Sequence, residues 1–465
     1  MKDLTEGSIP RHIVDVAVPL AVGMIVQTLY YLVDLYFVGK IGGTALAGVS
    51  AAASSTFLIM ALTQILGVGT VSLIAHATGR RDRDDANLVF NQSLLLAALL
   101  GATTLIGGYA FTDAYLATIA ADAVTVEAGR TYLYWFLPGM ALQFALIAMS
   151  SALRGTGIVK PTVAVQLLTV IVNIILAPVL IAGWGTGLPM GVAGAGLATS
   201  VAVACGVLLL LFYFRRLEKY VRLDAGLWRP RVVVWRRLLA IGLPAGGEFF
   251  LIFAFMAIIY WSIRDFGAEA QAGFGLGQRI MQSIFLPAMA LAFAAPAVAG
   301  QNFGARQAAR VRLTFRWTAV MSGLVMAALT LLCQISPSAL VRGFSDDAAV
   351  IDVAATFLRF ISWNFVPSAI IFTCSGMFQA LGNTWPALFS TAVRLGGFAL
   401  PLMWAARQEG FLIEHVWFLS VATMALQAIV SYILLRREFR RSLDFPPSAD
   451  ARSPDLLQPD VRIST

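Results

Sequence analysis

Twelve long apolar runs divide the chain, and they limit its possible folds more than any other feature. A helix that spans a bilayer needs about 20 mainly apolar residues, and each run is near that length. Strands of an outer-membrane barrel would instead be alternating segments of about ten residues. We therefore expect an all-α polytopic membrane protein. The predicted spans are 14–38, 46–76, 89–111, 132–153, 162–183, 192–214, 243–263, 272–303, 315–335, 357–378, 386–406 and 415–435.

The composition agrees with a lipid environment. Hydrophobic residues make up 59% of the chain and charged residues only 12%, against about a quarter charged in soluble domains. The net charge of +8 lies in short blocks between the apolar runs, so we expect no nucleic-acid partner. Cys205, Cys333 and Cys374 lie in apolar stretches at irregular spacing, which predicts neither a disulfide framework nor a zinc site.

The basic residues predict the orientation in the membrane. Residues 1–11 are short and mixed in charge, so we expect the first apolar run to remain in the mature protein. An even number of spans places both termini on one side, and the loops of that side hold most of the lysine and arginine residues. The positive-inside rule then predicts cytoplasmic termini and a location in the plasma (inner) membrane.

These patterns divide the chain into five parts. We predict a cytoplasmic N-terminus (1–13), an N-lobe of six helices (14–214), a basic linker (215–242), a C-lobe of six helices (243–435) and a cytoplasmic tail (436–465). We interpret the linker as a topological anchor rather than as a lipid-headgroup site. The tail is rich in proline and serine and poor in apolar residues, which predicts disorder.

An internal repeat relates the two halves. Backbone-special residues recur at an offset of 225 residues, which predicts that the same turns and kinks are built twice. Because this offset contains an even number of spans, both halves have the same orientation, and a cavity between them is the expected substrate site. The clearest pairs are Pro19 with Pro244, Gly79 with Gly304, Gly157 with Gly382, and Pro161 with Pro386.

The sequence lacks the motifs that several other classes of membrane protein require. There is no Gly-x-x-x-x-Gly-Lys-Ser/Thr run for a nucleotide phosphate and no Gly-x-Ser-x-Gly nucleophile motif. His12, His76 and His415 are isolated in the sequence. We therefore expect neither an enzyme nor a cofactor or resident metal. Two parallel halves also suit alternating access better than a fixed channel pore, which favours transport by exchange.

Asp34 is the foremost ionisable residue within a span. A charge at a helix centre costs about 2.5 to 3.5 kcal/mol on the insertion scale, so an acid there is a functional candidate. Gln27, Tyr30 and Tyr31 share its helical face. An acid in an apolar site with hydroxyl neighbours can bind and release a proton in the physiological range. The alternative is that Asp34 merely lies near the outer water boundary beside Lys40.

Other polar residues within the spans are weaker candidates. Asn173 could face the same cavity and join Asp34 in an ion site, for protons or sodium, or could simply make an interhelical hydrogen bond. Thr199 is a further member of such a network. Glu248 is flanked by phenylalanines that could bind lipophilic cations, although it could also lie near the cytoplasmic interface. Arg279 and Arg394 could pair with acids or extend toward water, and we leave both unassigned.

The motifs together resemble the multidrug and toxic compound extrusion (MATE) family of antiporters. Their order and spacing match that family from about Ile9 to Arg440. Any one run would be weak evidence, but the combination is specific. The matching segments are Val33-Asp34 with 38–42, 154–157 with Pro161, and 300–305.

The resemblance implies a V-shaped pair of six-helix lobes that exports organic, often cationic, compounds in exchange for protons or sodium ions. Asp34 matches the family's first-helix acid. Tyr30, Asn173 and Thr199 match a polar network of the DNA-damage-inducible branch. That branch carries an aspartate ahead of Pro178, where this chain has Ala177. A two-carboxylate site is therefore absent, and proton coupling is expected to rest on Asp34, with sodium as the alternative ion.

A second branch of the family carries acids on its seventh and tenth helices. Glu248 lies on the predicted seventh helix but one turn closer to its proline than that pattern requires, and the span 357–378 has no acid. We expect a monomer in the lipid bilayer with small organic substrates. A flippase for lipids or lipid-linked oligosaccharides is the alternative function, although few basic residues are buried to hold a pyrophosphate.

Overall fold

A computed structural model describes most of the chain. It covers residues 1–39, 41, 43–53, 55–119, 122–185, 187–342, 347–408 and 410–445. Within these ranges, the side chains of 29–36, 38, 39, 43–46, 53, 119, 265, 268, 269 and 349 are not described. Most of the predicted tail, 446–465, also lies outside the description. The regular elements in the described ranges are all helical, and twelve helical spans are long and apolar enough to cross a membrane. The predicted all-α, twelve-span architecture is confirmed.

The N-lobe contains seven α-helices that form six spans. The second span consists of the short helix α2 and the longer α3, which together replace the single predicted run from 46 to 76. The helices are α1 (Ile9–Gly39), α2 (Gly43–Ala53), α3 (Ser55–Gly79), α4 (Arg83–Ile119), α5 (Ala123–Gly155), α6 (Lys160–Ala182) and α7 (Val192–Arg216).

The C-lobe contains eight α-helices, and short 3-10 turns lie in the linker, after α8 and between α12 and α13. The helices are α8 (Val232–Ile263), α9 (Ala268–Gly304), α10 (Ala308–Ile335), α11 (Pro337–Arg342), α12 (Ala348–Ile361), α13 (Phe365–Leu381), α14 (Trp385–Ala405) and α15 (Ile413–Ser442). The turns are η1 (Ala225–Leu227), η2 (Arg264–Phe266) and η3 (Ser362–Asn364).

The helices mostly extend beyond the predicted runs, and three of the differences bear on the predicted organisation. The tenth span is divided by η3, where Thr330 Oγ1 donates to the backbone oxygen of Ser362 at 2.9 Å and Pro367 removes one backbone donor. The predicted linker end at residue 242 falls inside α8, because the helix continues outward through arginines; Arg237 contacts Asp85 at 3.3 Å. The predicted tail start at residue 436 falls inside α15. Hydropathy therefore locates the apolar parts of the helices and misses their polar ends.

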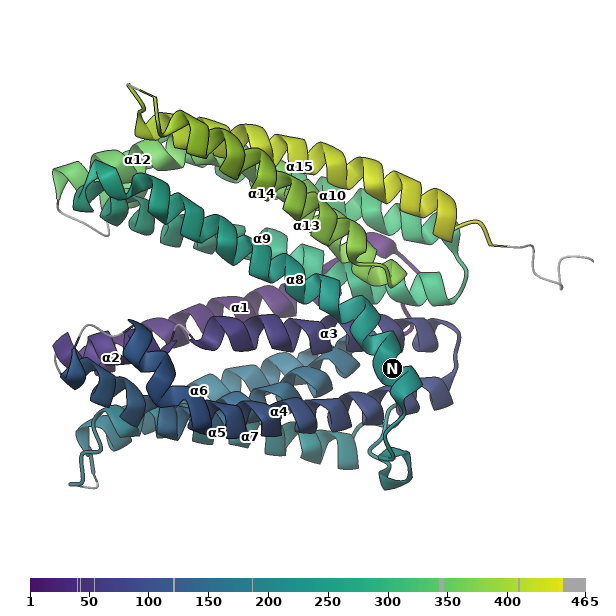
Figure 1. Ribbon diagram of the computed structural model, residues 1–465. Helices are drawn as coiled ribbons and strands as arrows, with labels where there is room; N and C mark the ends of the chain where they lie inside the picture. Colours follow the sequence, from purple (N-terminus) through teal and green to yellow (C-terminus); the bar gives the residue numbers. More distant parts are fainter. Residues whose placement is uncertain are drawn as a thin grey trace, which may run out of the picture.

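The repeat predicted from sequence is present in the helix boundaries. Helices α4 and α10 begin at Arg83 and Ala308, and α5 and α12 begin at Ala123 and Ala348, each pair 225 residues apart. Figure 1 shows the two lobes as separate bundles that approach each other near the N-terminus and diverge toward α2 and α12. Each lobe has a hydrophobic core of its own. The chain is thus two six-span repeats that meet mainly at one end.

Close helix crossings join the lobes. Helix α1 packs against α9, and α3 packs against both α8 and α9. At the α3–α8 crossing, a Cβ atom on Gly242 would lie 1.9 Å from the backbone oxygen of Ile65. Only glycine permits this approach of two backbones. Farther along the same crossing, the rings of Phe57 and Phe253 lie 4.4 Å apart.

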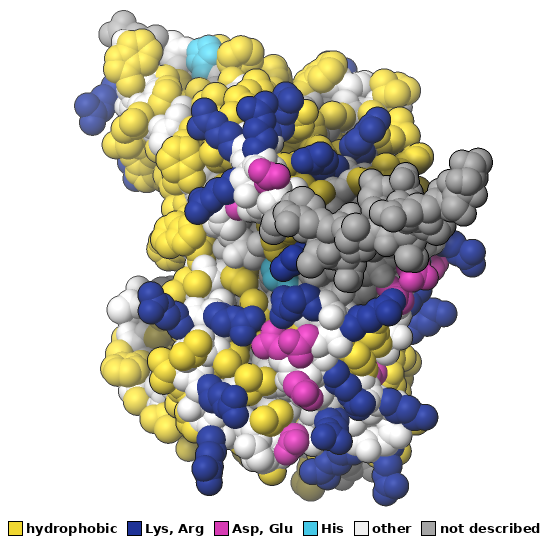
Figure 2. Space-filling view, turned by 90° about the vertical axis from the view of Figure 1, so that its right-hand side faces the viewer, with side chains coloured by type: hydrophobic (Ala, Val, Ile, Leu, Met, Phe, Trp, Pro, Cys, Tyr) yellow, Lys and Arg dark blue, Asp and Glu magenta, His cyan; other side chains and the backbone are white. Residues whose placement is uncertain are grey.

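Charged side chains gather at the end where the lobes meet. Figure 2 looks onto this end, and lysine and arginine side chains surround it in both lobes. The linker between α7 and α8 lies here and is held by buried amides of α4. Asn91 alone donates to the backbone oxygens of Asn87 and Arg222 and accepts from the backbone of Asp224 and the indole of Trp228. We call this region the basic end.

Candidate functional site

The predicted ion-coupling acid belongs to a part of α1 whose side chains are not described. Asp34, Tyr30 and Tyr31 lie outside the described side chains, so their roles stay predictions. Their helix does reach this region as one continuous element from Ile9 to Gly39, with Pro19 inside it. The described hydrogen bond from this face to another helix joins Gln27 to Gln166 on α6.

Asn173 and Thr199 are brought together by the contact between α6 and α7. The Asn173 side chain is fully buried, and its Nδ2 lies 3.3 Å from Thr199 Oγ1. Thr199 Oγ1 also donates to the backbone oxygen of Ala195 at 3.2 Å. Within the described residues, the Asn173 Oδ1 atom has no hydrogen-bond partner. A buried amide oxygen without a donor is costly, so this atom is a place for a donor or a cation.

Gln27 contacts a residue that the sequence analysis missed. Gln166 Nε2 donates to Gln27 Oε1 at 3.0 Å, which links α6 to α1. Gln166 lies seven residues before Asn173, two helical turns away on the same face of α6. That spacing was the available signal. The two amides make α6 the helix that carries the described polar contacts of the N-lobe site.

The missing second carboxylate leaves an apolar position. Ala177 is fully buried, and Pro178 follows it within α6. The helix ends at Gly183, whose left-handed φ of 73° allows its N–H to donate back to the Pro178 oxygen. No ionisable group stands at position 177, and the polar character of α6 comes from its amides.

Glu248 belongs to a separate group of contacts in the C-lobe. It is half-buried on α8, and Ser375 Oγ on α13 donates to its Oε2 at 3.0 Å. Thr391 on α14 also lies beside this carboxylate. Gln427 on α15 extends the group, since its Nε2 donates to Thr391 Oγ1 at 3.0 Å. Glu248 is thus held by side chains inside its lobe, away from Asn173.

Arg394 adds a cation to the same lobe. Its guanidinium carbon lies 4.0 Å from the centre of the Phe255 ring, a cation–π contact. Among the described residues its Nε atom is buried without a hydrogen-bond partner. A cavity of about 40 Å³ adjoins these groups, bounded by α8 and α14. Arg279, in contrast, is exposed. Sequence analysis left both arginines unassigned, and only packing distinguishes them.

The 225-residue offset relates the two groups of contacts position by position. Glu248 and Thr391 correspond to Gly23 and Gln166. A Cβ atom on Gly23 would lie 2.7 Å from Gln166 Oε1, so the two helices approach at this position in both lobes. The repeat therefore builds one contact twice, with a carboxylate in one lobe and an amide beside glycine in the other.

A second correspondence involves the predicted N-lobe site. The offset pairs Tyr30 with Phe255 and Asn173 with Phe398. In the C-lobe the rings of Phe255 and Phe398 lie 4.6 Å apart. An aromatic contact thus stands in one lobe at the positions where the other lobe carries a hydroxyl and an amide. The described residues contain no cluster of three histidine, cysteine, aspartate or glutamate side chains that could hold a metal ion.

Known proteins are similar to this chain in sequence and in fold. The family model described as MatE matches the chain twice, over residues 19–179 and 244–405. Multidrug export protein MepA of Staphylococcus haemolyticus is 23% identical over 449 residues, which cover 94% of this chain and 96% of that protein. The FAD transporter of Shewanella oneidensis is 26% identical over 451 residues, covering 94% and 97%.

A solved structure extends the similarity to three dimensions. It is described as the outward-facing conformation of a multidrug resistance MATE family transporter of the MOP superfamily. Its TM-score with this chain is 0.88 at 25% sequence identity, and the match covers 95% of this chain and 98% of the other. The arrangement of the two lobes is therefore one that this class of transporter adopts.

Proposed function

The chain belongs to the MATE family of membrane transporters, and from this premise we propose that it is a secondary active multidrug efflux antiporter. It would export organic, often cationic, compounds in exchange for protons, with sodium as the alternative coupling ion. The observation that carries this proposal is the arrangement of two like-oriented lobes, which meet at one end and diverge at the other (Figure 1). Such a pair can alternate access to a site between the lobes. Members of this family are transporters rather than enzymes and need no cofactor.

The basic end supports the proposed orientation. Lysine and arginine gather at the end where the lobes meet (Figure 2), and the positive-inside rule assigns such an end to the cytoplasm. Both termini would then lie in the cytoplasm, and the protein in the plasma (inner) membrane. The lobes diverge on the opposite side, so the structure would represent an outward-facing state. The similarity to an outward-facing transporter supports this assignment.

We place ion coupling at Asp34 together with Asn173. The C-lobe contact between Phe255 and Phe398 supports this, because the repeat assigns Tyr30 and Asn173 to the equivalent positions. The Asn173 oxygen lacks a described donor, and a protonated carboxyl or a sodium ion could satisfy it. With Ala177 in place of a second acid, a single carboxylate would carry the exchanged charge.

The proposed substrate site lies between the lobes, with polar contacts from each. Gln27 and Thr199 would contribute from the N-lobe, and Glu248 from the C-lobe. Glu248 accepts a hydrogen bond from Ser375, so its carboxyl group is held in place within its own lobe. We therefore expect Glu248 to bear on cation binding rather than on ion exchange.

A gradient-driven efflux assay tests this proposal. Inverted membrane vesicles would receive a proton gradient or a sodium gradient, with ethidium as the cationic dye, for the parent protein, Asp34→Asn and Glu248→Gln. We expect proton-driven uptake into the vesicles, abolished by Asp34→Asn and weakened less by Glu248→Gln. Asp113→Asn is the matched control, because this exposed acid pairs only with Arg130 among described groups.

Three outcomes would contradict parts of the proposal. Uptake driven by a sodium gradient alone would mean that sodium, and not the proton, is the coupling ion. A larger loss in Glu248→Gln than in Asp34→Asn would move the ion site to the C-lobe. Movement of fluorescent lipid between leaflets, without gradient-driven dye uptake, would mean that the protein is a flippase for lipids or lipid-linked oligosaccharides and not an efflux transporter.

A second substrate class has one specific observation in its favour. Arg394 provides a half-buried cation in the C-lobe whose Nε is unpaired among described groups, and a relative is named FAD transporter. Guanidinium groups bind phosphates through paired N–H donors. Radiolabelled FAD in the same vesicles tests this class. Uptake that Arg394→Gln removes, while ethidium uptake persists, would assign an anionic dinucleotide to the C-lobe.

A further inference from the structure

Among the hydrogen bonds that cross between the lobes at the basic end, two are related by the repeat. His76 on α3 donates through Nε2 to the backbone oxygen of Ala380 at 2.6 Å. Gln301 on α9 donates through Nε2 to the backbone oxygen of Gly155 at 3.0 Å. The two donors are 225 residues apart, and so are the two acceptors. Neither pair is apparent from the sequence, because histidine and glutamine differ and the acceptors are backbone atoms.

We propose that these two bonds form an inter-lobe latch, which holds the basic end closed and must break when the transporter opens there. The proposal rests on the transport function proposed above. It makes His76 and Gln301 positioning residues of the transport cycle, since neither needs to touch substrate. Each bond joins a helix of one lobe to the last turn of a helix in the other lobe, α3 to α13 and α9 to α5.

Both hydrogen bonds of the latch lie in a buried interface, where an unpaired polar group is costly. Gln301 is fully buried and His76 is only 9% exposed. The acceptor oxygens belong to helix C-terminal turns, whose last carbonyls have no partner within their own helix. A bond broken in a dry interface would leave a donor and an acceptor unsatisfied. Both bonds are therefore expected to break together, as the lobes separate and water enters.

Glycines bring the two donor helices into contact beside the latch. A Cβ atom on Gly79 would lie 2.0 Å from the backbone oxygen of Gln301, and one on Gly304 would lie 2.2 Å from the backbone oxygen of His76. These glycines are also 225 residues apart, so α3 and α9 cross at symmetric positions. The ring of His76 packs on Phe303, with centres 4.9 Å apart. The crossing fixes the distance over which the latch can form.

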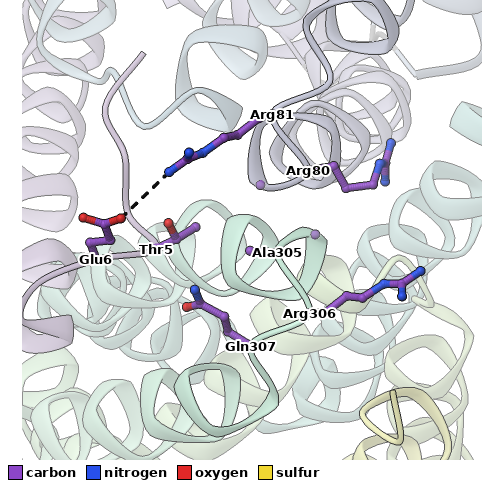
Figure 3. A pocket seen from close by; sticks show the side chains of 9 residues that line it. Thr5, Glu6, Arg80, Arg81, Ala305, Arg306 and Gln307 are labelled. Atoms are coloured by element: carbon purple, nitrogen blue, oxygen red, sulfur yellow. Dashed lines mark ion pairs between the residues drawn. The ribbon is translucent and has the colours of Figure 1, made fainter. Parts of the chain in front are cut away.

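The N-terminal segment covers the Gln301 half of the latch. The backbone N–H of Leu4 donates to Gln301 Oε1 at 3.0 Å, so the same amide is held at both ends. Lys2 donates from its backbone to Thr156 in the N-lobe at 2.9 Å. Figure 3 shows the adjoining surface, a hollow of about 500 Å³ lined by the N-terminal segment and the ends of α3 and α9. Water could reach the latch from this hollow.

Distances between spin labels on the two lobes test the latch. Labels at Asp84→Cys on α4 and Arg312→Cys on α10 are exposed on opposite lobes at the basic end, in a background where the three native cysteines are alanine. Pulsed electron–electron double resonance measures the distribution of distances between the labels in lipid, and this distribution gives the ratio of open to closed protein. We expect His76→Ala, which loses one hydrogen bond, to raise this ratio about fivefold. Gln301→Ala also loses the bond from Leu4 and should raise it at least as much, and the double variant should raise it further.

Two matched variants separate the latch from general damage. His76→Gln copies the chemistry of the partner position, and we expect it to keep the parent distribution. Gln334→Ala removes another amide that donates to a backbone oxygen, Arg359 at 2.7 Å, but within the C-lobe. It should leave the distances unchanged. If the alanine pair does not fold, His76→Phe with Gln301→Met keeps side-chain volume while it removes both donors.

The outcomes decide the proposal without a transport assay. An unchanged distance distribution in the double variant would overturn the latch. So would equal opening in His76→Gln and His76→Ala, because ring packing on Phe303 would then hold the lobes. If the parent protein shows no gradient-driven efflux, the proposed function is contradicted. The distance result would still describe a property of the fold.

Discussion

Asn173 differs in chemistry from the residue at the equivalent position of the other repeat. Its C-lobe counterpart is Phe398, which packs on Phe255, whereas Asn173 is buried with its Nδ2 beside Thr199 Oγ1. A phenylalanine is a satisfied core residue, but an amide needs partners that it does not fully have among the described groups. One substitution between repeats therefore distinguishes a packing position from a candidate ion site.

Replacing Asn173 should impair transport more than folding. For Asn173→Ala we expect proton-driven dye efflux to fall about fivefold or more, since a group that stabilises the ion-bound state by about 1 kcal/mol is lost. Thr169→Ala is the control on the same helix, because among described groups its hydroxyl donates only to the Val165 oxygen of its own helix. Initial rates in vesicles with matched protein amounts measure both. Equal rates for Asn173→Ala and the control would remove Asn173 from the site.

At the scale of single helices, polar groups determine where each element begins and how it is anchored. Asp122 caps α5, and its carboxylate accepts from the Thr125 backbone N–H at 2.7 Å. This hydrogen bond lowers the pKa of Asp122 below its ordinary value of 3.8. Its contribution to stability is therefore complete above that ordinary value and is lost as the pH falls through the lowered pKa.

The cap at Asp122 predicts an order among variants. Asp122→Ala should lower the midpoint of thermal unfolding in detergent at pH 7, because α5 loses its N-cap acceptor, whereas Asp122→Asn, which keeps an acceptor oxygen without the charge, should lie between the two. Differential scanning fluorimetry at pH 7 and at a series of pH values falling well below 3.8 measures this. The gap between the parent and Asp122→Ala should shrink at the lower pH values. A gap that persists at the lower pH values would show that the charge of the cap does not contribute.

The linker gives a second prediction for an element. Asn91 makes four hydrogen bonds, three of them to the linker. Asn91→Ala should release the segment and speed tryptic cleavage after Arg222 about tenfold, because three linker groups lose their hydrogen-bond partner. Cleavage is followed by gel electrophoresis in detergent, with Gln334→Ala as the control. Parent-like cleavage in Asn91→Ala would mean that other contacts hold the linker.

The whole molecule depends on how closely the lobes can approach. At the α3–α8 crossing, Gly242 leaves no room for a Cβ atom against the backbone of Ile65. Gly242→Ala should therefore destabilise the closed basic end by about 1–3 kcal/mol, the usual cost of overpacking. Spin-label distances at Asp84→Cys and Arg312→Cys should then lengthen.

A glycine without neighbours supplies the control. Gly323 on α10 has no atom within 4 Å of an added Cβ, so Gly323→Ala should keep the parent distances and slightly favour its helix. Closed distances in Gly242→Ala would show that the crossing can relax. An effect of Gly323→Ala equal to that of Gly242→Ala would mean that glycine loss, rather than lobe contact, changes the distances.

Sequence alone determined the number of spans, the all-α class and the repeat. These follow from local rules, since a bilayer requires about 20 apolar residues per helix and a repeated turn requires the same glycines and prolines. The pairing of Asn173 with Thr199 came from family resemblance. The role of Asp34 remains a prediction.

Only the tertiary structure decided the partners of the polar side chains. Gln166 with Gln27, Ser375 with Glu248, and the two bonds of the latch join residues far apart in sequence. Hydropathy and helical period state which face of a helix is polar, but they do not state how neighbouring helices rotate against each other. The backbone oxygens that complete the latch carry no sequence signal, so packing alone selects them.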